Sequence, residues 1–370
     1  MSENNWYSLK DTNEVNSPSL LVYPERIEEN IRMMVSISGS VSSLRPHIKT
    51  HKMAEIVAMQ QRHGIQKFKC ATIAEAELLG QCGAEDILLA MQPVGANINR
   101  FFNLVDAFPN ARFSTLVDNE LTLNQIAEQA SKQNKITSLY LDINSGMNRT
   151  GCLPDEQAAS LYSIMENNPN IHAKGLHAYD GHIRNTNVQE RTERCNEAFH
   201  KVLDLKAVIK KNGIVVPDII AGGSPSFPMH SKRTGVDVSP GTTLLWDARY
   251  SDLFPDMQFL HAAVLFIRII SKPSENIICF DLGHKSVACE MDFPRIKIMG
   301  LEDSQQISQS EEHLVVQTQR PDDFKVGDAF YAIPVHVCPT VAKYEEVLTV
   351  SGGEVTGAWK VAARNQKITI

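Results

Sequence analysis

The chain has 370 residues, of which 43% are hydrophobic and 21% are charged. This composition is typical of an ordinary globular protein and excludes global disorder. The formal net charge of −7 argues against nucleic-acid or anionic-membrane binding as the main role. The longest apolar run, over 259–270, is interrupted by His261 and Arg268, so no membrane span is expected.

The seven cysteines are widely scattered and form no CxxC pair. The first residues are polar and acidic, and they lack the basic start and apolar stretch of a secretory signal. These two features predict a reduced, cytoplasmic protein.

From about residue 40 to 250, short β-rich runs alternate with helical stretches. This alternation predicts parallel strands joined by helices, and eight such units in roughly 200 residues match the size of a (β/α)8 TIM barrel. A doubly wound open sheet is the alternative, but no GxGxxG motif follows an early strand. The expected strands are 42–49, 67–71, 86–90, 111–117, 137–144, 172–179, 216–223 and 235–241.

After about residue 250 the sequence changes to strands separated by Gly, Pro and Asp turns, without long amphipathic helices. The sequence therefore predicts an α/β barrel over 17–250 and a second, mostly antiparallel β domain over 251–370. A short early strand, 19–23, precedes the barrel series.

The first expected barrel strand ends in a basic cluster that contains Arg45, His47 and Lys49. Side chains alternate along a strand, so these three residues are expected on one face. At the C-terminal end of the strand they would line the mouth, where the active sites of barrels lie. A lysine beside other cations is a candidate for covalent attachment of a carbonyl cofactor. The alternative is a solvated, basic strand end.

Two glycine-containing loops follow the seventh and eighth expected strands, with Gly222, Gly223 and Ser224 in one and Gly241 and Thr242 in the other. Glycines let backbone N–H groups approach a phosphate, and barrels often bind phosphate with these two loops. Either loop taken alone is more often an ordinary turn.

Two further side chains lie at expected strand ends. Arg149 follows a tight turn after the fifth strand and suits an anionic oxygen, unless it pairs with Asp142 or Asp155. Tyr179 ends the sixth strand on the same face as His177 and could reach a bound ring. The alternative for Tyr179 is an aromatic of the barrel core with its hydroxyl at the rim.

In the β domain, His336 and Cys338 are two residues apart, which would place them on one face of a strand. An imidazole and a thiolate suit Zn²⁺, and only two protein ligands would leave open positions, as in a catalytic site. A pair with this spacing is also often incidental.

Together these segments resemble fold-type III pyridoxal-phosphate (PLP) enzymes, the alanine racemase-like group, and more closely the D-threonine aldolase and D-serine dehydratase family. The resemblance extends from residue 17 to the C-terminal WKVAAR segment. RPHIKTHK matches the cofactor-lysine signature and implies that Lys49 binds PLP. NSGMNRTG implies that Arg149 lies near the phenolic oxygen of PLP, and HAYDGH implies that Tyr179 lies beside the cofactor. AGGSPS and PGTT match the phosphate-binding loops.

HVCPT matches the metal motif of the family. The aldolase branch resembles HxD at this point, whereas D-serine dehydratase-like enzymes carry HxC, so His336 and Cys338 favour the dehydratase branch. The following VAKY departs from the NLHD-like continuation of the aldolase branch, which leaves the substrate open. The metal expected from the thiolate is zinc, with manganese as the alternative.

The resemblance implies a PLP- and metal-dependent lyase that acts on a D-3-hydroxy amino acid by β-elimination, giving a 2-oxo acid and ammonia. The enzyme alternative is retro-aldol cleavage to glycine and an aldehyde. A racemase would not need the metal, and non-catalytic PLP-binding proteins resemble the barrel alone. The sequence does not identify the group that protonates the leaving oxygen, for which His182 and a metal-bound water are equal candidates. The likeness also implies a homodimer with the active site near the interface, and a strand 19–23 that joins the β domain.

Overall fold

The computed structural model describes residues 5–370. The chain divides into two compact units. The barrel unit contains residues 32–49, 57–241 and 365–370, and the β unit contains residues 5–31, 50–56 and 242–364. Within the described part of the chain, no helix combines the length and apolar character needed to cross a membrane.

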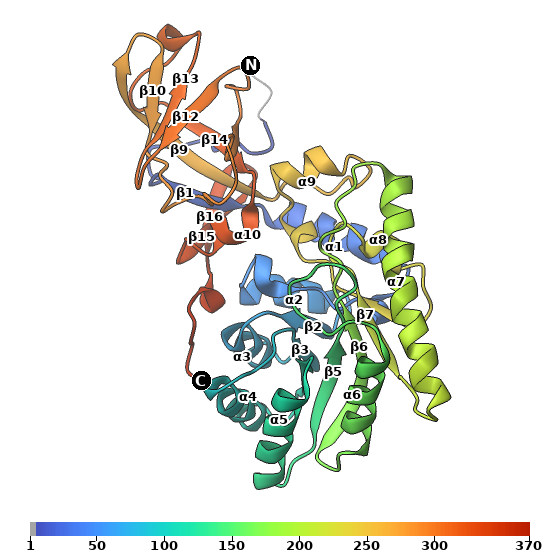
Figure 1. Cartoon of the computed structure of the whole chain (residues 1–370). Coiled ribbons are helices and arrows are strands. Elements are labelled where there is room, and N and C mark those ends of the chain that lie inside the picture. The colour runs from blue at the N-terminus through green and yellow to red at the C-terminus, as the bar shows by residue number, and fades with distance from the viewer. Residues whose placement is uncertain (1–4) are drawn as a thin grey trace. The chain divides into compact units, whose positions relative to one another are not determined.

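The barrel unit is built on seven parallel strands, which neighbour one another in chain order from β2 to β8. In Figure 1 these strands lie side by side with helices packed outside them. Their bounds are Lys67–Cys70 (β2), Asp86–Leu89 (β3), Arg112–Val117 (β4), Thr137–Asp142 (β5), Ile171–Ala178 (β6), Asp218–Ala221 (β7) and Val236–Val238 (β8). The predicted α/β barrel architecture is thus confirmed.

The expected first strand, 42–49, is reduced to a short bridging segment. Leu44 forms a parallel bridge with Val238 of β8, and His47 forms one with Lys69 of β2. A 3₁₀ helix precedes this segment at Val41–Ser43 (η1), and another follows at Ile48–Thr50 (η2). Pro46 lies between the two bridges and has no N–H to donate, which favours two isolated bridges over a longer ladder.

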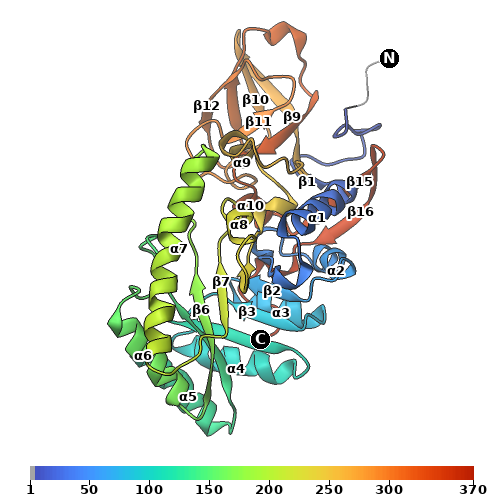
Figure 2. The same cartoon turned by 90° about the vertical axis from the view of Figure 1, so that its right-hand side faces the viewer.

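Helices follow the strands, as the alternating pattern predicts. Several begin with a polar residue whose side chain accepts a backbone N–H of the first turn, such as Thr72 before α3, Asn119 before α5 and Asp155 before α6. Figure 2 shows α7 as the long helix beside β6 and β7. The helix bounds are Pro24–Ser38 (α1), Ala54–Arg62 (α2), Ile73–Gln81 (α3), Ala96–Ala107 (α4), Glu120–Lys132 (α5), Glu156–Asn167 (α6), Val188–Lys211 (α7), Phe227–His230 (α8), Ala248–Leu253 (α9) and Val337–Val341 (α10).

An apolar layer fills the barrel where Leu88, Leu116, Tyr140 and Ile220 pack together from four strands. All four side chains are almost fully buried. Burying such side chains stabilises the fold by about 1.5–3 kcal/mol each, relative to leaving them exposed.

Arg45 is also inside the barrel, with only 1% of its surface exposed. Its guanidinium contacts Asp86 at 2.5 Å and Asp237 at 3.2 Å. The expectation that Arg45 lines the mouth beside Lys49 is therefore wrong. The 3₁₀ turn at 48–50 ends the strand alternation before it reaches Lys49, and the buried carboxylates supply the partners that a buried cation requires.

The β unit contains a nine-stranded sheet in the described residues. Its main order is β12-β13-β10-β9-β1-β15-β16, while β14 pairs with both β9 and β11. The early strand β1 lies antiparallel to β9 and parallel to β15. The bounds are Ser19–Val22 (β1), Ala263–Ser274 (β9), Ile277–Phe280 (β10), Ile296–Ile298 (β11), Gln305–Gln309 (β12), Leu314–Gln317 (β13), Ala329–Pro334 (β14), Glu346–Ser351 (β15) and Glu354–Lys360 (β16).

The core of the β unit forms where alternate residues of the central strands face one side of the sheet. Leu21 of β1, Val264 and Phe266 of β9 and Val350 of β15 belong to one buried cluster. The sheet is mostly antiparallel, as the pattern after residue 250 predicts. Three further 3₁₀ helices are Thr242–Leu244 (η3), Pro321–Asp323 (η4) and Ala362–Arg364 (η5).

Replacing Arg45 with Met should destabilise the protein by about 3–5 kcal/mol, because Asp86 loses its buried cationic partner. Urea unfolding followed by circular dichroism measures this change. Lys132→Met is the matched control, since Lys132 pairs with Glu128 on an exposed helix face and should leave the unfolding midpoint unchanged. Equal midpoints for the two variants would show that the Arg45 pair contributes little.

Candidate functional site

The residue predicted to carry the cofactor, Lys49, lies in the 3₁₀ turn η2 that follows the bridge at His47. Its backbone N–H donates to Nδ1 of His47 at 3.2 Å. The turn lies beyond the C-terminal end of the bridging segment, which is the end of a barrel where active sites form. Lys49 is half-buried, so its position combines access with partial exclusion of water.

Three cationic groups surround the ring of Tyr179, which directly follows β6. The distances from the ring centroid are 5.9 Å to Lys49 Nζ, 5.4 Å to Lys69 Nζ and 5.0 Å to Arg149 Cζ. The structure thus brings together Lys49, Arg149 and Tyr179, which the sequence singled out separately. Lys69 is a fourth member that the sequence analysis missed. Such a cluster suits an anionic, planar ligand.

Asp142 and Asp155 were the alternative partners for Arg149, but each is engaged elsewhere. Asp142 contacts Nδ1 of His177 at 2.7 Å. Asp155 accepts two N–H groups at the start of α6. Because Asp142 and Asp155 already accept hydrogen bonds from other groups, the structure favours the interpretation of Arg149 as a ligand-binding residue.

The loop after β7 passes through a space that admits only glycine. A Cβ on Gly222, whose φ is +79°, would lie 2.9 Å from the His230 ring, and one on Gly223 would lie 2.8 Å from the Tyr179 ring. The Ser224 hydroxyl accepts the N–H of Gly241 at 3.1 Å, which joins this loop to the one after β8. The two loops predicted to bind phosphate are therefore connected.

The loop after β8 also contains Ser239, whose hydroxyl is buried and has no hydrogen-bond partner among residues 5–370. A buried hydroxyl without a partner is costly, and an anion such as phosphate would accept its proton. Cationic groups, a glycine cradle and an unsatisfied hydroxyl together fit PLP in the barrel unit.

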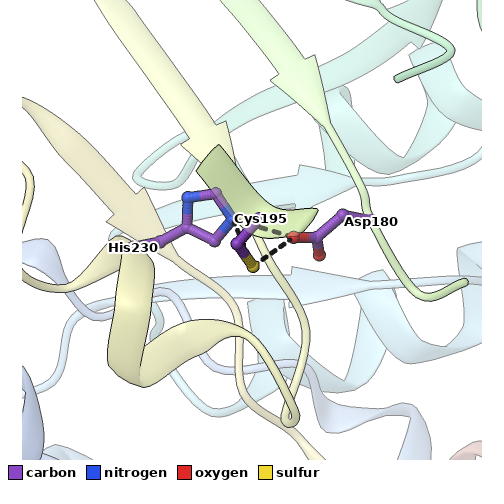
Figure 3. A group of neighbouring side chains, drawn as sticks. All are labelled: Asp180, Cys195 and His230. Carbon is purple, nitrogen blue, oxygen red and sulfur yellow. Dashed lines mark hydrogen bonds and ion pairs between the residues drawn. The ribbon is translucent and has the colours of Figure 1, made fainter. Parts of the chain in front are cut away.

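A buried cluster of Asp180, Cys195 and His230 lies next to this cradle, from the loop after β6, from α7 and from α8 (Figure 3). Their ligand atoms lie within 4.8 Å of one another, a spacing that could hold a metal ion. Asp180 Oδ2 is 2.8 Å from His230 Nε2 and 3.5 Å from Cys195 Sγ. Ser226 donates to the other carboxylate oxygen at 2.6 Å.

The protons of this cluster favour a hydrogen-bond network over a metal centre. Arg233 Nε donates to His230 Nδ1 at 3.3 Å, so the proton of a neutral His230 lies on Nε2 and points to Asp180. Burial and the neighbouring Asp180 raise the pKa of Cys195, which keeps it a thiol rather than a metal-binding thiolate. Burial opposes ionisation of Asp180, but the hydrogen bonds from His230 and Ser226 lower its pKa below the ordinary value.

The network fixes the loop that is predicted to bind phosphate. Ser226 Oγ accepts a hydrogen bond from the N–H of Gly223 at 3.2 Å and donates one to Asp180 Oδ1. The carboxylate of Asp180 thus connects the glycine loop, through Ser226, with His230 of α8, and Asp180 itself directly follows Tyr179 in the chain. None of Asp180, Cys195 and His230 was among the predicted site residues, because their spacing in sequence matches no short motif.

The predicted metal ligands lie in the β unit, at the start of α10. His336 is the N-cap residue of α10 and Cys338 lies in its first turn, so the expectation that both share a strand face is wrong. Strand β14 ends at Pro334, and the chain turns into the helix. The two side chains nevertheless interact, and both are half-buried.

Glu290 accepts a hydrogen bond from Nδ1 of His336. A carboxylate on one ring nitrogen orients the other toward a metal, the usual arrangement of a metal-binding histidine. The Cys338 sulfur lies 3.2 Å from Thr50 Oγ1 and 3.5 Å from Thr242 Oγ1. Burial opposes protonation of His336, but Cys338 and Glu290 raise its pKa to about 9. This donor set fits a divalent metal.

Thr242 and His182 are the remaining residues to which the sequence analysis gave a role. Thr242 opens η3 and faces Cys338 within the β unit, while its neighbour Gly241 belongs to the barrel unit, in the loop that is predicted to bind phosphate. His182 is exposed, and its ring lies close to Gly146, where an added Cβ would be 2.9 Å from Nε2.

Comparison with known proteins gives two family matches. Residues 22–247 match the model described as the alanine racemase N-terminal domain. Residues 262–350 match a domain model named after serine dehydratases. The two matches together cover the strands of the barrel and most of the β unit.

Individual relatives align with nearly the whole chain. A D-threonine aldolase from Arthrobacter sp. is 26% identical over 361 residues, 95% of this chain and 93% of the relative. A D-serine dehydratase from Dictyostelium discoideum is 24% identical over 384 residues, 94% of this chain and 95% of the relative.

Solved structures share the fold. D-threonine aldolase from Filomicrobium marinum superimposes with a TM-score of 0.86 at 24% identity and covers 95% of both chains. A D-threo-3-hydroxyaspartate dehydratase, known from Delftia sp. HT23, has been solved as a histidine-to-alanine variant and as a cysteine-to-alanine variant in the metal-free form. The latter has a TM-score of 0.83 at 16% identity, covering 94% of this chain and 97% of that one. The two replaced residues are two positions apart.

Replacing Asp180 with Asn should destabilise the protein by about 3 kcal/mol, because the amide cannot accept from Ser226, His230 and Cys195 together. Thermal unfolding monitored by differential scanning calorimetry measures the loss. Asp204→Asn, on an exposed face of α7, is the control and should match the unmodified protein. A stable Asp180→Asn protein would mean that the carboxylate does not anchor the loop.

Proposed function

The chain belongs to the alanine racemase N-terminal domain family, and we propose that it is a PLP- and metal-dependent lyase that removes water from a D-3-hydroxy amino acid. The observation that carries the proposal is the His336–Cys338 pair with Glu290 on the histidine. A racemase has no use for such a pair. The aldolase and dehydratase relatives are lyases, and lyase activity on D-hydroxy amino acids is the activity they share.

The residues of the barrel unit would bind the cofactor. Lys49 would hold PLP covalently, the joined loops with Gly222, Gly223 and Gly241 would take the phosphate, and Arg149 would meet the phenolic oxygen. Bound PLP supplies an electron sink for the electrons released when a bond at the substrate α-carbon breaks. With its amine free, Lys49 would be the general base that takes the α-proton of the substrate.

Tyr179 would hold the cofactor ring in place. Its own ring is confined by Gly223 on one side and by three cationic groups around it. Gly181, two residues further on, leaves no room for a Cβ next to the Tyr179 hydroxyl, so the position of the phenol is closely determined.

In the β unit, His336 and Cys338 would hold the metal, which supplies Lewis acidity for the departure of the 3-hydroxyl group. Because Glu290 holds Nδ1 of His336, the other ring nitrogen, Nε2, points away from the Glu290 carboxylate and is left for the metal. In the D-threo-3-hydroxyaspartate dehydratase, the histidine and the cysteine that were replaced are two positions apart, which is the spacing of His336 and Cys338, and this supports a shared role for the pair. A thiolate favours zinc, with manganese as the alternative.

Retro-aldol cleavage is the second candidate, because a D-threonine aldolase is among the relatives that align with nearly the whole chain. In that reaction the base acts on the hydroxyl proton and the bond between the α- and β-carbons breaks. The cysteine at 338 favours elimination, since the family resemblance assigns HxC to the dehydratase branch and HxD to the aldolase branch.

The atoms of the elimination reaction balance in two steps. The substrate loses its α-proton and hydroxide as water, and the product enamine takes up water to give a 2-oxo acid and ammonia. D-serine would give pyruvate. The proton that leaves with the hydroxyl would come from His182 or from a water on the metal. We further propose that the enzyme works as a homodimer with the site near the interface, in the cytoplasm.

Borohydride reduction of the PLP-loaded protein should fix the cofactor on one lysine, and peptide mass spectrometry should locate it at Lys49. Lys49→Ala should lose both the label and turnover, because no other amine would hold the cofactor at this turn. A label on a different lysine, Lys69 above all, would overturn the assignment of Lys49.

Product analysis with D-serine and D-threonine, with and without a chelator, tests the reaction type. Pyruvate and 2-oxobutyrate are expected, and the chelator or Cys338→Ala should reduce turnover by at least about 100-fold by removing the metal or a ligand that holds it. Cys289→Ala, an exposed cysteine, is the control and should retain activity. Glycine as the main product would select the aldolase, and full activity without metal would end the metal proposal.

A further inference from the structure

Lys69 is a buried lysine that the proposed reaction does not use. It lies on β2, where its backbone pairs with Leu88 of β3 and bridges His47 on the other side. Only 3% of its surface is exposed. A lysine is rarely buried to this extent without a partner, so its surroundings indicate what it does.

Lys69, His177 and Asp142 form a continuous polar chain across three strands. Asp142 is two residues beyond Tyr140 on β5, so it faces the barrel interior above the apolar layer. His177 of β6 pairs in register with Asp142. All three side chains are buried.

The distances determine the direction of the hydrogen bonds. His177 Nδ1 lies 2.7 Å from Asp142 Oδ1, and His177 Nε2 lies 2.7 Å from Lys69 Nζ. The ionised carboxylate of Asp142 can only accept a hydrogen bond, so the proton of the His177 ring lies on Nδ1. Nε2 of His177 therefore accepts a hydrogen bond from the ammonium group of Lys69. Gln92 donates to the second oxygen of Asp142 at 2.8 Å, which holds the carboxylate in this orientation.

The charges around Lys69 do not balance locally. Lys49 from η2 and Arg149 from the loop after β5 repel its ammonium, while Asp142 and Asp180 attract it. His47 lies across the backbone bridge, and the ring of Tyr179 lies 5.4 Å away. Burial, followed by the charge of Lys49, lowers the pKa of Lys69 to about 7. An additional anion in the pocket would reverse this effect.

A small cavity lies at the Asp142 end of the polar chain. Asp142, Arg149 and Tyr179 line it, whereas Lys69 does not. Arg149 and Lys69 thus approach the same aromatic ring from two different elements. Both cations therefore lie near the ring beside which the cofactor is proposed to bind.

We propose that Lys69 is a second cation of the cofactor pocket, which binds the ionised ring hydroxyl of PLP as an ammonium group held in place by His177 and Asp142. This role rests on the proposed function, because it requires PLP in the barrel unit. Lys69 thereby makes cofactor binding depend on pH. The ammonium is present below about pH 7 in the unloaded protein, and the bound anion stabilises it.

The sign of the pH dependence follows from linkage. An anion binds the protonated form more tightly, so binding raises the pKa of Lys69 and takes up a proton above pH 7. The affinity contributed by Lys69 is full below pH 7 and declines as the pH rises. A variant with no titrating group at position 69 lacks this pH-dependent contribution to the affinity.

The test uses 4-deoxypyridoxine 5′-phosphate, which keeps the ring hydroxyl and the phosphate but has no aldehyde for Lys49. Its dissociation constant is measured by calorimetry at pH 6 and pH 9 with the full chain freed of cofactor. Lys69→Met should bind at least about tenfold more weakly than the unmodified protein at pH 6 and within about threefold of it at pH 9. Because both proteins share the titration of the ligand, the ratio isolates Lys69.

Two controls separate the possible causes. Lys174→Met changes a lysine near the start of β6 that pairs with Asp218, and it should leave both constants unchanged. Inorganic phosphate, which lacks the ring hydroxyl, should bind Lys69→Met and the unmodified protein alike. Lys69→Arg keeps a permanent charge, so it should bind the analogue more tightly than the unmodified protein at pH 9, and this comparison provides the test if Lys69→Met does not fold.

The outcomes are distinguishable. If the analogue does not bind the unmodified protein at either pH, the proposed PLP function fails together with this inference. If the analogue binds and the ratio between Lys69→Met and the unmodified protein is near one at both pH values, the PLP function stands and the role of Lys69 is refuted.

Discussion

Charge buried inside the parallel barrel is the constraint on which the rest of this structure depends. An ionised group away from water is costly unless it meets an opposite charge or a full set of hydrogen bonds. Arg45 meets two carboxylates inside the barrel. Asp180 accepts three donors beside the glycine loop, from Ser226, His230 and Cys195. Each buried charge thereby fixes the relative position of several strands and loops.

At the mouth of the barrel the charges are not balanced as they are in its interior, because cationic side chains outnumber anionic ones there. Lys49, Lys69 and Arg149 approach the Tyr179 ring, while Asp142 is already held by His177. A planar anion is the ligand that this imbalance favours, and PLP carries both a phosphate and an ionisable ring hydroxyl. The two loops after β7 and β8 would supply the remaining contacts, and at Gly222 and Gly223 a larger residue would collide with the rings of His230 and Tyr179. Affinity for the cofactor and stability of the barrel thus have a common physical origin.

Much of the fold follows from local pattern. Apolar alternation and capping residues locate the strands and helices to within a few residues, and the (β/α) repetition predicts parallel strands. The exceptions have local causes. The chain turns at 48–50 and again after β14, so Lys49 and the His336–Cys338 pair lie on helical turns rather than on strands. The alternation of side chains along a short segment predicts a strand, but it does not show at which residue the chain leaves the strand and turns.

The sequence by itself determined the architecture, and it singled out the proposed cofactor lysine, phosphate loops and metal pair, because each depends on residues close together in the chain. Only the tertiary structure decided which distant residues meet. Lys69, Asp142 and His177 come from three strands, and Asp180, Cys195 and His230 come from a loop and two helices. Hydrogen bonds are short and directional, so such groups are recognised only when the folded backbone brings their atoms within about 3 Å.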